Sequence, residues 1–256
     1  MTLGEPPLLS LSGLRRSFGG VQAVRNVSFD VVDSRITGLI GPNGAGKSTV
    51  LNMIAGATKP NAGSIRFLGD EIAGKPAFKV ARRGIIRTFQ TAAEFHHLSV
   101  IENLLVASPS PRGERLLTAV FCRRWWRRYE EEMIERAREL LRAFEIAAKE
   151  DELAGSLSGG QKRLLELARS LMPAPRLLLL DEPMAGVNPA LVRRIEEHLV
   201  RLCDEGVTML LIEHELSVVE RLCDTVIVMA QGEVLSSGTM ADLRRNQEVL
   251  DAYLVG

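Results

Sequence analysis

The chain has 256 residues, of which 46% are hydrophobic and 25% charged, and its 32 basic side chains balance 32 acidic ones. This neutral balance argues against a protein that coats nucleic acid, which usually carries a basic excess. No apolar run reaches the roughly 18 residues of a membrane-spanning helix, and no secretory signal pattern is visible. The three cysteines form no CxxC pair, so we expect free thiols in a reducing cytoplasm.

Short apolar runs alternate with helical patterns along the chain, which predicts an α/β protein. The run 177–180 is all leucine, as expected of a central strand that is covered on both faces. After Pro189, leucine and isoleucine recur at helical spacing, and proline suits the first turn of a helix. The predicted strands are Leu8–Leu11, Val27–Val32, Ile36–Ile40, Ser64–Leu68, Leu177–Leu180, Val207–Ile212 and Thr225–Met229.

The middle of the chain has a different character. From about Thr91 to Leu157 no segment has the pattern of a strand, and apolar residues between Met133 and Phe144 fall on one helical face. Two prolines in Ser108–Gly113 predict a break between two helices. We therefore expect one domain, 1–256, in which a helical subdomain (91–157) is inserted into an α/β core formed by 1–90 and 158–256.

Residues 41–49 match the phosphate-binding loop pattern GxxxxGK(S/T). They follow a predicted strand and open a helix, which is the context that this loop requires. Glycine lets successive backbone N–H groups surround phosphate oxygens, and a helix N-terminus favours anions. We expect Lys47 to reach the outer phosphates of a bound nucleotide and the Ser48 hydroxyl to bind Mg²⁺. The predicted nucleotide-binding residues of this loop are Gly41, Pro42, Asn43, Gly44, Ala45, Gly46, Lys47, Ser48 and Thr49.

Two carboxylates, Asp181 and Glu182, follow the leucine strand at its carboxyl end, where α/β sheets place their ligands. Asp181 suits the shell of Mg²⁺, because a carboxylate on a magnesium-bound water balances charge beside the phosphates. Glu182 is placed to polarise the attacking water. The alternative is that both carboxylates simply end the strand in solvent.

The sequence Leu-Ser-Gly-Gly-Gln at 157–161 stands directly before a predicted helix, Gln161–Leu171. Ser158, Gly159 and Gly160 offer a hydroxyl and backbone N–H groups at a helix start, which would make a second phosphate-binding end in the same chain. Taken alone, the motif would be read as an ordinary serine N-cap.

The phosphate loop, LSGGQ and LLLLDEP, in this order, resemble the nucleotide-binding domain of an ABC ATPase over nearly the whole chain. The resemblance implies a P-loop NTPase core with an antiparallel β portion and an inserted helical subdomain, and hydrolysis of ATP with Mg²⁺. It also implies that Gln90 is the Q-loop glutamine that contacts Mg²⁺, that His214 contacts the γ-phosphate as a catalytic residue, and that Phe18 stacks on adenine. Without the motif order, the phenylalanine would be read as a core residue, the glutamine as a surface residue and the histidine as structural.

The same resemblance implies that two such domains pair head to tail. The signature residues of one, Ser158, Gly159, Gly160 and Gln161, would then cover the γ-phosphate that Lys47 of the other holds. Catalysis would consist mainly of positioning and charge stabilisation. Asn188 departs from the family pattern, which usually has aspartate there in the loop that crosses between the domains.

The stretches 18–24, 182–189 and 212–215 are similar to those of ATP-binding subunits of branched-chain amino-acid importers. This resemblance implies a peripheral protein on the cytoplasmic face of the inner or plasma membrane. Its partners would be a second ATPase subunit (identical or paralogous), two permease subunits and an external substrate-binding protein, with no nucleic acid. Urea or amide importers and lipopolysaccharide exporters share the motifs and remain alternatives; a soluble ABC ATPase is less favoured, because the chain has one phosphate loop and no long coiled coil.

The segment Arg112–Arg128 carries six arginines and one glutamate, a surplus of five positive charges (six minus one), and includes Trp125 and Trp126. Clustered arginine and tryptophan suit contact with lipid headgroups or with a permease. The alternative is a solvated helix whose arginines pair with the acidic residues 130–132.

Overall fold

The computed structural model describes residues 7–88, 95–109 and 123–254. The chain divides into two compact units. The segment 91–157, which the sequence predicts to be an inserted helical subdomain, falls within unit 2, which also holds the helix that begins within LSGGQ. Unit 1 comprises Met1–Gln90, Arg176–Gly186 and Val192–Gly256, and unit 2 comprises Thr91–Pro175 and Val187–Leu191.

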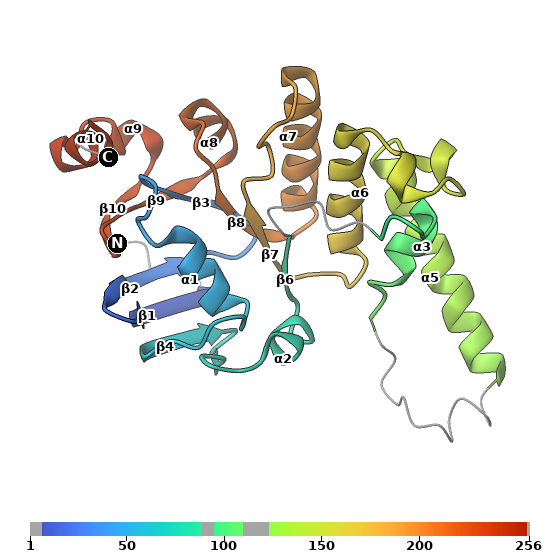
Figure 1. Cartoon of the computed structure of the whole chain (residues 1–256), viewed down its shortest axis with the longest axis horizontal. Helices are drawn as coiled ribbons and strands as arrows, with labels where there is room; N and C mark the ends of the chain where they lie inside the picture. The colour runs from blue at the N-terminus through green and yellow to red at the C-terminus, as the bar shows by residue number, and fades with distance from the viewer. Residues whose placement is uncertain (1–6, 89–94, 110–122, 255–256) are drawn as a thin grey trace. The chain divides into compact units, whose positions relative to one another are not determined.

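Unit 1 is built on one sheet, in which ten strands of the described chain follow the order β5-β4-β1-β2-β10-β9-β3-β8-β7-β6 (Figure 1). Strands β9, β3, β8, β7 and β6 pair in parallel, whereas β1, β2, β4 and β5 pair antiparallel. The predicted α/β core and its antiparallel portion are both present. The strands are β1 (Leu9–Phe18), β2 (Val21–Val31), β3 (Ile36–Ile40), β4 (Ala62–Phe67), β5 (Asp70–Glu71), β6 (Ile85–Arg87), β7 (Leu177–Asp181), β8 (Thr208–Ile212), β9 (Thr225–Ala230) and β10 (Glu233–Gly238).

Three of these strands, β5, β6 and β10, were not predicted from the sequence. Strands β5 and β6 are too short to show a period, and the second half of β10 reads Ser-Ser-Gly, without apolar alternation. Strand β1 also continues through Arg15 and Arg16 to a hairpin turn at Gly19, whose φ of 58° favours glycine. These segments join the sheet through backbone hydrogen bonds, which do not require an alternation of apolar and polar side chains, so the sequence pattern does not reveal them.

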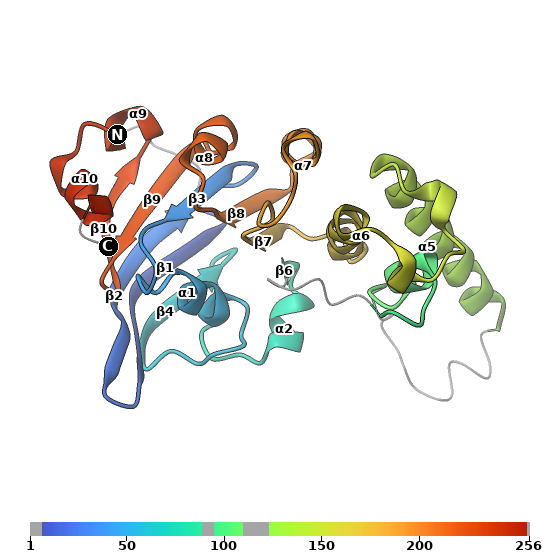
Figure 2. The ribbon, with the colours of Figure 1, turned by 45° about the horizontal axis from the view of Figure 1, so that its top comes forward.

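Helices cover both faces of the parallel strands, as such a sheet requires. Neighbouring strand residues point to opposite faces, so Leu39 packs in the core cluster with the apolar side of α1, while Ile40 packs with Val219 and Met240. Figure 2 accordingly shows α1 and α8 on opposite sides of β3. The helices of this unit are α1 (Lys47–Ile54), α2 (Ala77–Ala81), α8 (Leu216–Leu222), α9 (Met240–Leu243) and α10 (Gln247–Leu254), and α7 (Pro189–Asp204) begins in unit 2 and continues in unit 1.

Unit 2 is helical within its described residues, apart from an isolated bridge between Ser99 and Leu153. Ala137 and Leu141 on the predicted apolar face of α5 are buried, and Arg136 of the same helix donates to the last carbonyl groups of α6 at 2.9 and 3.0 Å. Those carbonyls lack partners within their own helix, so the arginine anchors α5 while it caps α6. The elements are α3 (Val100–Leu105), α5 (Arg123–Ala143), η1 (Ala147–Lys149), η2 (Ala154–Ser156) and α6 (Gly159–Leu171).

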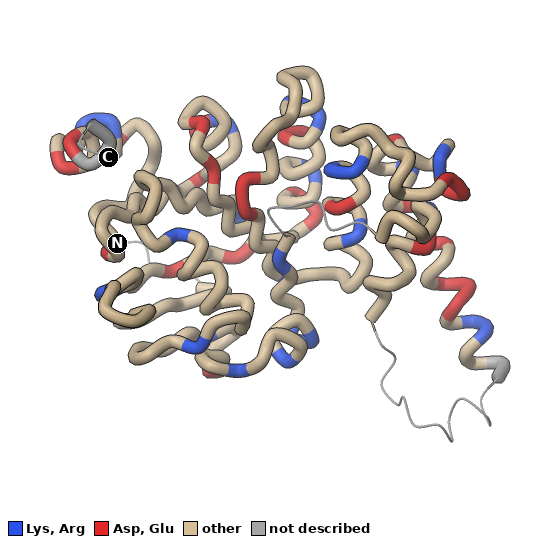
Figure 3. Tube along the Cα trace, viewed as in Figure 1, with Lys and Arg blue, Asp and Glu red and all other residues tan. Residues whose placement is uncertain are grey.

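Residues of both charge signs follow one another along α5 (Figure 3). Arg128 and Glu132 form an ion pair at 3.0 Å, and Arg142 pairs with Glu135 at the same distance. Within the described residues, no helix combines the length and the apolar character needed to cross a membrane.

Candidate active site

The phosphate-binding loop connects β3 to α1, as predicted. Gly41 and Gly46 have φ angles of 146° and 96°, and a Cβ atom would lie 2.0 Å from the Met229 carbonyl oxygen at the first and 2.4 Å from that of Ala23 at the second. Adjacent backbone therefore leaves room only for glycine at these two positions. Gly44 also has a positive φ, 79°, but a Cβ there would meet nothing within 4 Å, so this part of the loop faces open space.

Lys47, the first residue of α1, is buried and turns back over the loop. Its ammonium group donates to the carbonyl oxygens of Gly41 at 2.7 Å and Pro42 at 2.9 Å. Burial lowers the pKa of Lys47, and the negative charges of Glu182 and Asp181 act in the opposite direction. The N-cap residue of α1 is Gly46, which has no side chain to cap the helix, so the first N–H groups of α1 can bind an anion beside the ammonium.

Asp181 is fully buried at the last position of β7. Its Oδ2 accepts a hydrogen bond from the Arg87 guanidinium at 2.7 Å, and its Oδ1 is buried without a hydrogen-bond partner in the part of the chain that the structure describes. This burial contradicts the alternative that the carboxylate merely ends its strand in solvent. A buried oxygen of this kind can accept from an ordered water or bind a cation.

Glu182 leaves the strand in a left-handed conformation, with a φ of 51°, and its N–H donates to the carbonyl oxygen of Ile212 at 3.0 Å. This conformation is uncommon outside glycine and turns the side chain away from the strand direction. Glu182 Oε1 lies 2.8 Å from Nε2 of His214, which follows the neighbouring strand β8. The carboxylate and the imidazole therefore act as a hydrogen-bonded pair.

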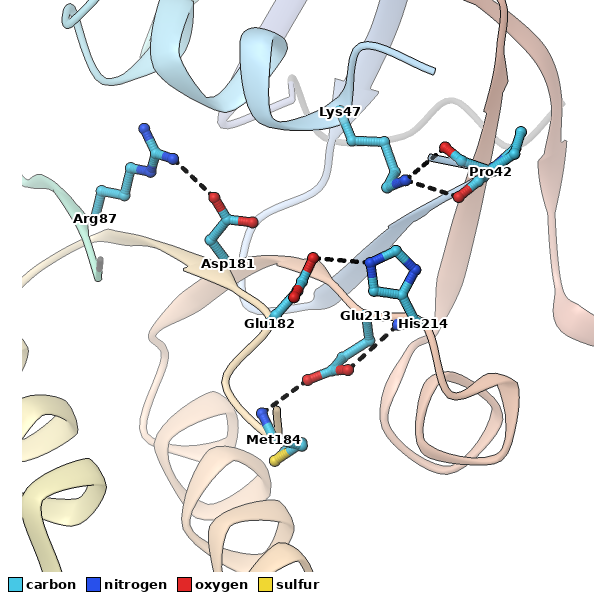
Figure 4. Close-up of polar contacts among 9 residues, drawn as sticks. Pro42, Lys47, Arg87, Asp181, Glu182, Met184, Glu213 and His214 are labelled. Atoms are coloured by element: carbon cyan, nitrogen blue, oxygen red, sulfur yellow. Dashed lines mark hydrogen bonds and ion pairs between the residues drawn. The ribbon is translucent and has the colours of Figure 1, made fainter. Parts of the chain in front are cut away.

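The parallel register explains why these groups meet. Strands β7 and β8 are neighbours, with Asp181 opposite Ile212, so residues that follow each strand emerge at the same edge of the sheet. Figure 4 shows the side chains of Lys47, Asp181, Glu182 and His214 turned toward one region. An ammonium group, two carboxylates and an imidazole assembled at a phosphate loop can bind a phosphorylated ligand and accept a proton from water.

Two further residues, Phe18 and Gln90, are predicted to contact the nucleotide. Phe18 lies at the end of β1 and is 48% exposed, with the Arg16 guanidinium 4.5 Å from its ring centroid. The guanidinium covers one face of this exposed ring, which leaves the other face to stack on a planar ligand. Gln90 lies outside the described residues.

The signature motif lies in unit 2 at the start of α6 and forms a capping box. Ser158 Oγ accepts from the Gln161 N–H at 3.4 Å, while Gln161 Oε1 accepts from the Ser158 N–H at 3.0 Å. A Cβ at Gly160 would come within 2.4 Å of a Leu191 methyl group, whereas one at Gly159 would meet nothing within 4 Å. Packing inside the chain therefore gives a reason for glycine at 160 and none at 159.

Asn188, the departure from the usual aspartate, caps the start of α7. The Leu191 N–H donates to its Oδ1 at 2.9 Å. Asparagine and aspartate serve equally well as N-caps, so the substitution keeps the local fold while it removes a charge.

The basic segment is only partly described. Residues 112–122 of this segment, among them Arg112 and Arg115, lie outside the described residues. Further along, Trp125 stacks on Tyr129 with ring centroids 5.8 Å apart, and the ion pair of Arg128 with Glu132 is of the kind that the solvated-helix alternative predicts.

Comparison with known proteins decides the family. A family model described as ABC transporter matches residues 24–185, more than half of the chain. The chain belongs to the ABC transporter family. The predicted fold class and the predicted ATPase of ABC type are therefore confirmed.

This ABC subunit is similar to full-length curated relatives. It is 41% identical over 249 residues to the high-affinity branched-chain amino acid transport ATP-binding protein BraF of Pseudomonas aeruginosa, covering 97% of this chain and 98% of the relative. It is 39% identical to the probable branched-chain amino acid transport ATP-binding protein LivG of Archaeoglobus fulgidus, covering 96% and 95%. A crystal structure of the ADP conformation of an ATP-binding cassette of an ABC transporter matches with a TM-score of 0.85 and 34% identity, covering 98% and 100%.

Two residues of this ABC subunit's site were missed by the sequence analysis. Arg87 binds Asp181, and the buried carboxylate of Glu213 accepts from the N–H groups of Met184 at 2.9 Å and His214 at 3.3 Å. Burial raises the pKa of Glu213, and these two backbone donors oppose the shift. Glu213 thereby ties the segment after Glu182 to the segment after β8. Glu213 lies within the stretch 212–215 that resembles importer subunits, and Arg87 stands three residues before Gln90, but nothing in the sequence predicts the contacts that either side chain makes.

Proposed function

We propose that this ABC subunit hydrolyses ATP with Mg²⁺ to power import of a branched-chain amino acid or a similar small solute. The observation that carries the hydrolytic part is the meeting of Lys47, Asp181, Glu182 and His214 at the phosphate loop (Figure 4). The solute class rests on similarity to the relatives described above, whose names state branched-chain amino acid transport and which match along almost their whole length.

The phosphates would lie against the loop 41–49 and the first N–H groups of α1. The Lys47 ammonium group donates to two neutral carbonyl oxygens in this structure. Phosphate oxygens are charged and therefore stronger acceptors for the same group. Its burial strengthens that attraction, because charges interact more strongly where water is excluded. At the other end of the nucleotide, the exposed ring of Phe18 would stack on adenine.

The oxygen ligands that the site offers fit Mg²⁺. This ion prefers hard oxygen ligands and keeps several waters, so it needs few protein groups, in agreement with the lack of a cluster of three metal-binding side chains among the described residues. Ser48 Oγ, exposed at the start of α1, and the orphaned Oδ1 of Asp181 supply such oxygens, and Gln90 is a further proposed ligand. When bound, the ion would neutralise charge on the phosphoryl group that is transferred.

Glu182 and His214 would serve the attacking water. Glu182 accepts the proton of that water, while His214 orients the carboxylate through their 2.8 Å contact and faces the γ-phosphate with the remainder of its ring. Because the sheet fixes both residues at one edge, little reorganisation is needed during the reaction.

A second ATPase subunit, a copy of this chain or a paralogue, would complete the site. The open space beside Gly159 suits approach of a group from outside the chain, and a phosphate held by the partner would fit there against the N–H groups of α6. Two subunits related by a two-fold axis would each supply Ser158, Gly159, Gly160 and Gln161 to the nucleotide of the other. Two permeases and an external substrate-binding protein would join this pair at the cytoplasmic face of the membrane.

Purification from solubilised membranes tests the proposal. We expect the tagged chain to bring down two integral membrane subunits, identified by mass spectrometry, and the complex in liposomes to take up labelled leucine only with ATP and its binding protein. Uptake of urea or amides, or extraction of lipopolysaccharide, would assign another solute and keep the ATPase. Recovery without membrane subunits, in a chain that hydrolyses ATP, would contradict the transport role.

A further inference from the structure

Arg87 makes two contacts that join three elements of unit 1. The residue ends β6, and its side chain is 15% exposed. Nη2 donates to Asp181 Oδ2 at 2.7 Å, and Nη1 donates to Asn52 Oδ1 at 2.5 Å (Figure 4 shows the first contact). Asn52 belongs to α1, the helix that begins at Lys47, so the arginine links the strand that carries Asp181 to the helix that carries the phosphate loop.

The guanidinium suits this task because its donors are fixed in one plane. A flexible lysine ammonium group would neutralise the carboxylate charge, whereas a planar guanidinium that binds two oxygens also sets their orientation. Asp181 has no exposed surface, so its charge depends on partners within the protein. With Oδ2 held by Arg87, the direction of Oδ1, the buried oxygen without a described partner, is fixed as well.

A competing partner for Asp181 is close by. The negative charge of Asp181 acts on the buried ammonium of Lys47, which at present donates to two loop carbonyl oxygens instead. Without a cation on Oδ2, the carboxylate would turn to Lys47, a positive charge on which Asp181 already acts. That pairing would withdraw an oxygen from the metal and an ammonium group from the phosphates.

We propose that Arg87 is a positioning residue for the magnesium site: it holds Oδ2 of Asp181 and Oδ1 of Asn52, so that Oδ1 of Asp181 stays available to Mg²⁺ or one of its waters. The inference rests on the proposed function. Such outer partners of metal-binding groups commonly contribute about ten- to a hundredfold to metal affinity.

The test measures binding rather than turnover. A fluorescent ATP analogue is titrated into each protein with EDTA and then at increasing concentrations of magnesium chloride. In Arg87→Gln we expect the magnesium concentration for half-maximal enhancement of binding to rise by about tenfold or more. Affinity in EDTA should stay within about twofold of the parent, because the phosphate loop is intact. Arg87→Lys keeps a charge on Oδ2 and should show a smaller rise.

Arg83→Gln is the matched control, because it removes an arginine that pairs with Asp70 at 2.6 Å in the same unit, outside the site. A merely structural role for Arg87 would lower thermal stability, or affinity with and without magnesium alike, and leave the magnesium midpoint where the parent has it. That result in folded Arg87→Gln or Arg87→Lys overturns the inference. A lower midpoint overturns it too, since Arg87 would then compete with the ion. Lack of magnesium-dependent binding in the parent would instead refute the proposed function.

Discussion

Glu182→Gln separates the charge of this side chain from its shape. The amide has the size of the carboxylate, and its oxygen can still accept from His214 Nε2 at the 2.8 Å seen here, so the pair keeps its geometry. The negative charge is lost, and with it the capacity to accept a proton. A positioned base contributes about 10²–10⁴-fold to turnover, which corresponds to roughly 2.7–5.5 kcal/mol of barrier.

His214→Ala asks the converse question, because it keeps the charge and removes the orienting contact. A hydrogen bond to a charged group is worth about 1.5–3 kcal/mol, or roughly a 10- to 150-fold loss of turnover. Neither change touches the phosphate loop, so binding of ATP should be little affected in both. Because Glu182→Gln cannot consume ATP, it should also accumulate as an ATP-bound dimer.

Phosphate release measured at saturating ATP decides between these roles, with a fluorescent analogue for binding and light scattering for dimer formation. Glu205→Gln, on an exposed carboxylate just beyond α7, is the matched control and should behave as the parent. Normal phosphate release by Glu182→Gln would remove the residue from the chemistry. Loss of ATP binding in His214→Ala would show that the histidine holds the nucleotide and does not act on the reaction.

Three further changes test single contacts. Ser48→Ala and Asp181→Asn should each raise the magnesium concentration needed for nucleotide binding, and unchanged titrations in both would misplace the ion. Asn188→Ala should lower the free energy of unfolding by about 1 kcal/mol in urea denaturation, and Asn188→Asp should restore it, since the cap is then kept. Burial raises the pKa of Glu213 above its ordinary 4.5, so the contribution of Glu213 to stability is present below pH 4.5 and is lost as pH rises through the higher folded value. The free energy of unfolding of Glu213→Gln relative to the parent should therefore increase with pH. A difference that stays constant with pH would contradict this.

Features that depend on adjacent residues were the ones that the sequence could predict. The phosphate loop must place glycines where backbone from other strands leaves no room for a side chain, as at Gly41 and Gly46. This requirement appears in the sequence as a short motif of adjacent residues. The same holds for the buried leucine strand and the two carboxylates that follow it. Strand order could not be predicted in this way, because it is decided by pairing between distant segments.

Arg87 shows where sequence reasoning ends. It meets Asp181 across 94 positions of sequence, and only because the short strand β6 pairs with β7 in a register that sets Arg87 opposite Leu179. Glu213 is similar, since its two backbone partners come together only when β7 and β8 are neighbours. A lone arginine or glutamate beside a motif carries no pattern, so contacts of this kind emerge from the fold.

The composite site is the most consequential of the proposals, and a crossed mixing experiment tests it. Lys47→Ala removes the group that holds the phosphates, and Gly159→Asp sets a negative charge at the signature. Gly159 is preferred to Gly160, because a side chain at 160 would displace a methyl group of Leu191, whereas the space at 159 is open. Each variant alone should be inactive, although Gly159→Asp should still bind ATP as a monomer.

If each signature acts on the nucleotide of the other subunit, a mixed dimer of the two variants has one intact site and one doubly damaged site. Equal mixing makes half of the dimers mixed, so about a quarter of the parent activity should return. The matched control mixes the parent with a chain that carries both changes. There every mixed dimer has one lesion in each site, and only the parent homodimers, about a quarter of the total, should work.

A site built within one chain gives the opposite pair of results. The two single variants would then yield no activity, because each damages its own site, and the mixture of parent and double variant would keep about half, because every parent chain works wherever it is placed. If the dimer needs both sites intact, the mixture of the two single variants would show no activity, and the mixture of parent and double variant would still show about a quarter of the parent activity. A site built within one chain does not predict this quarter. With subunit exchange verified by cross-linking, a value near half in the control mixture refutes the composite site.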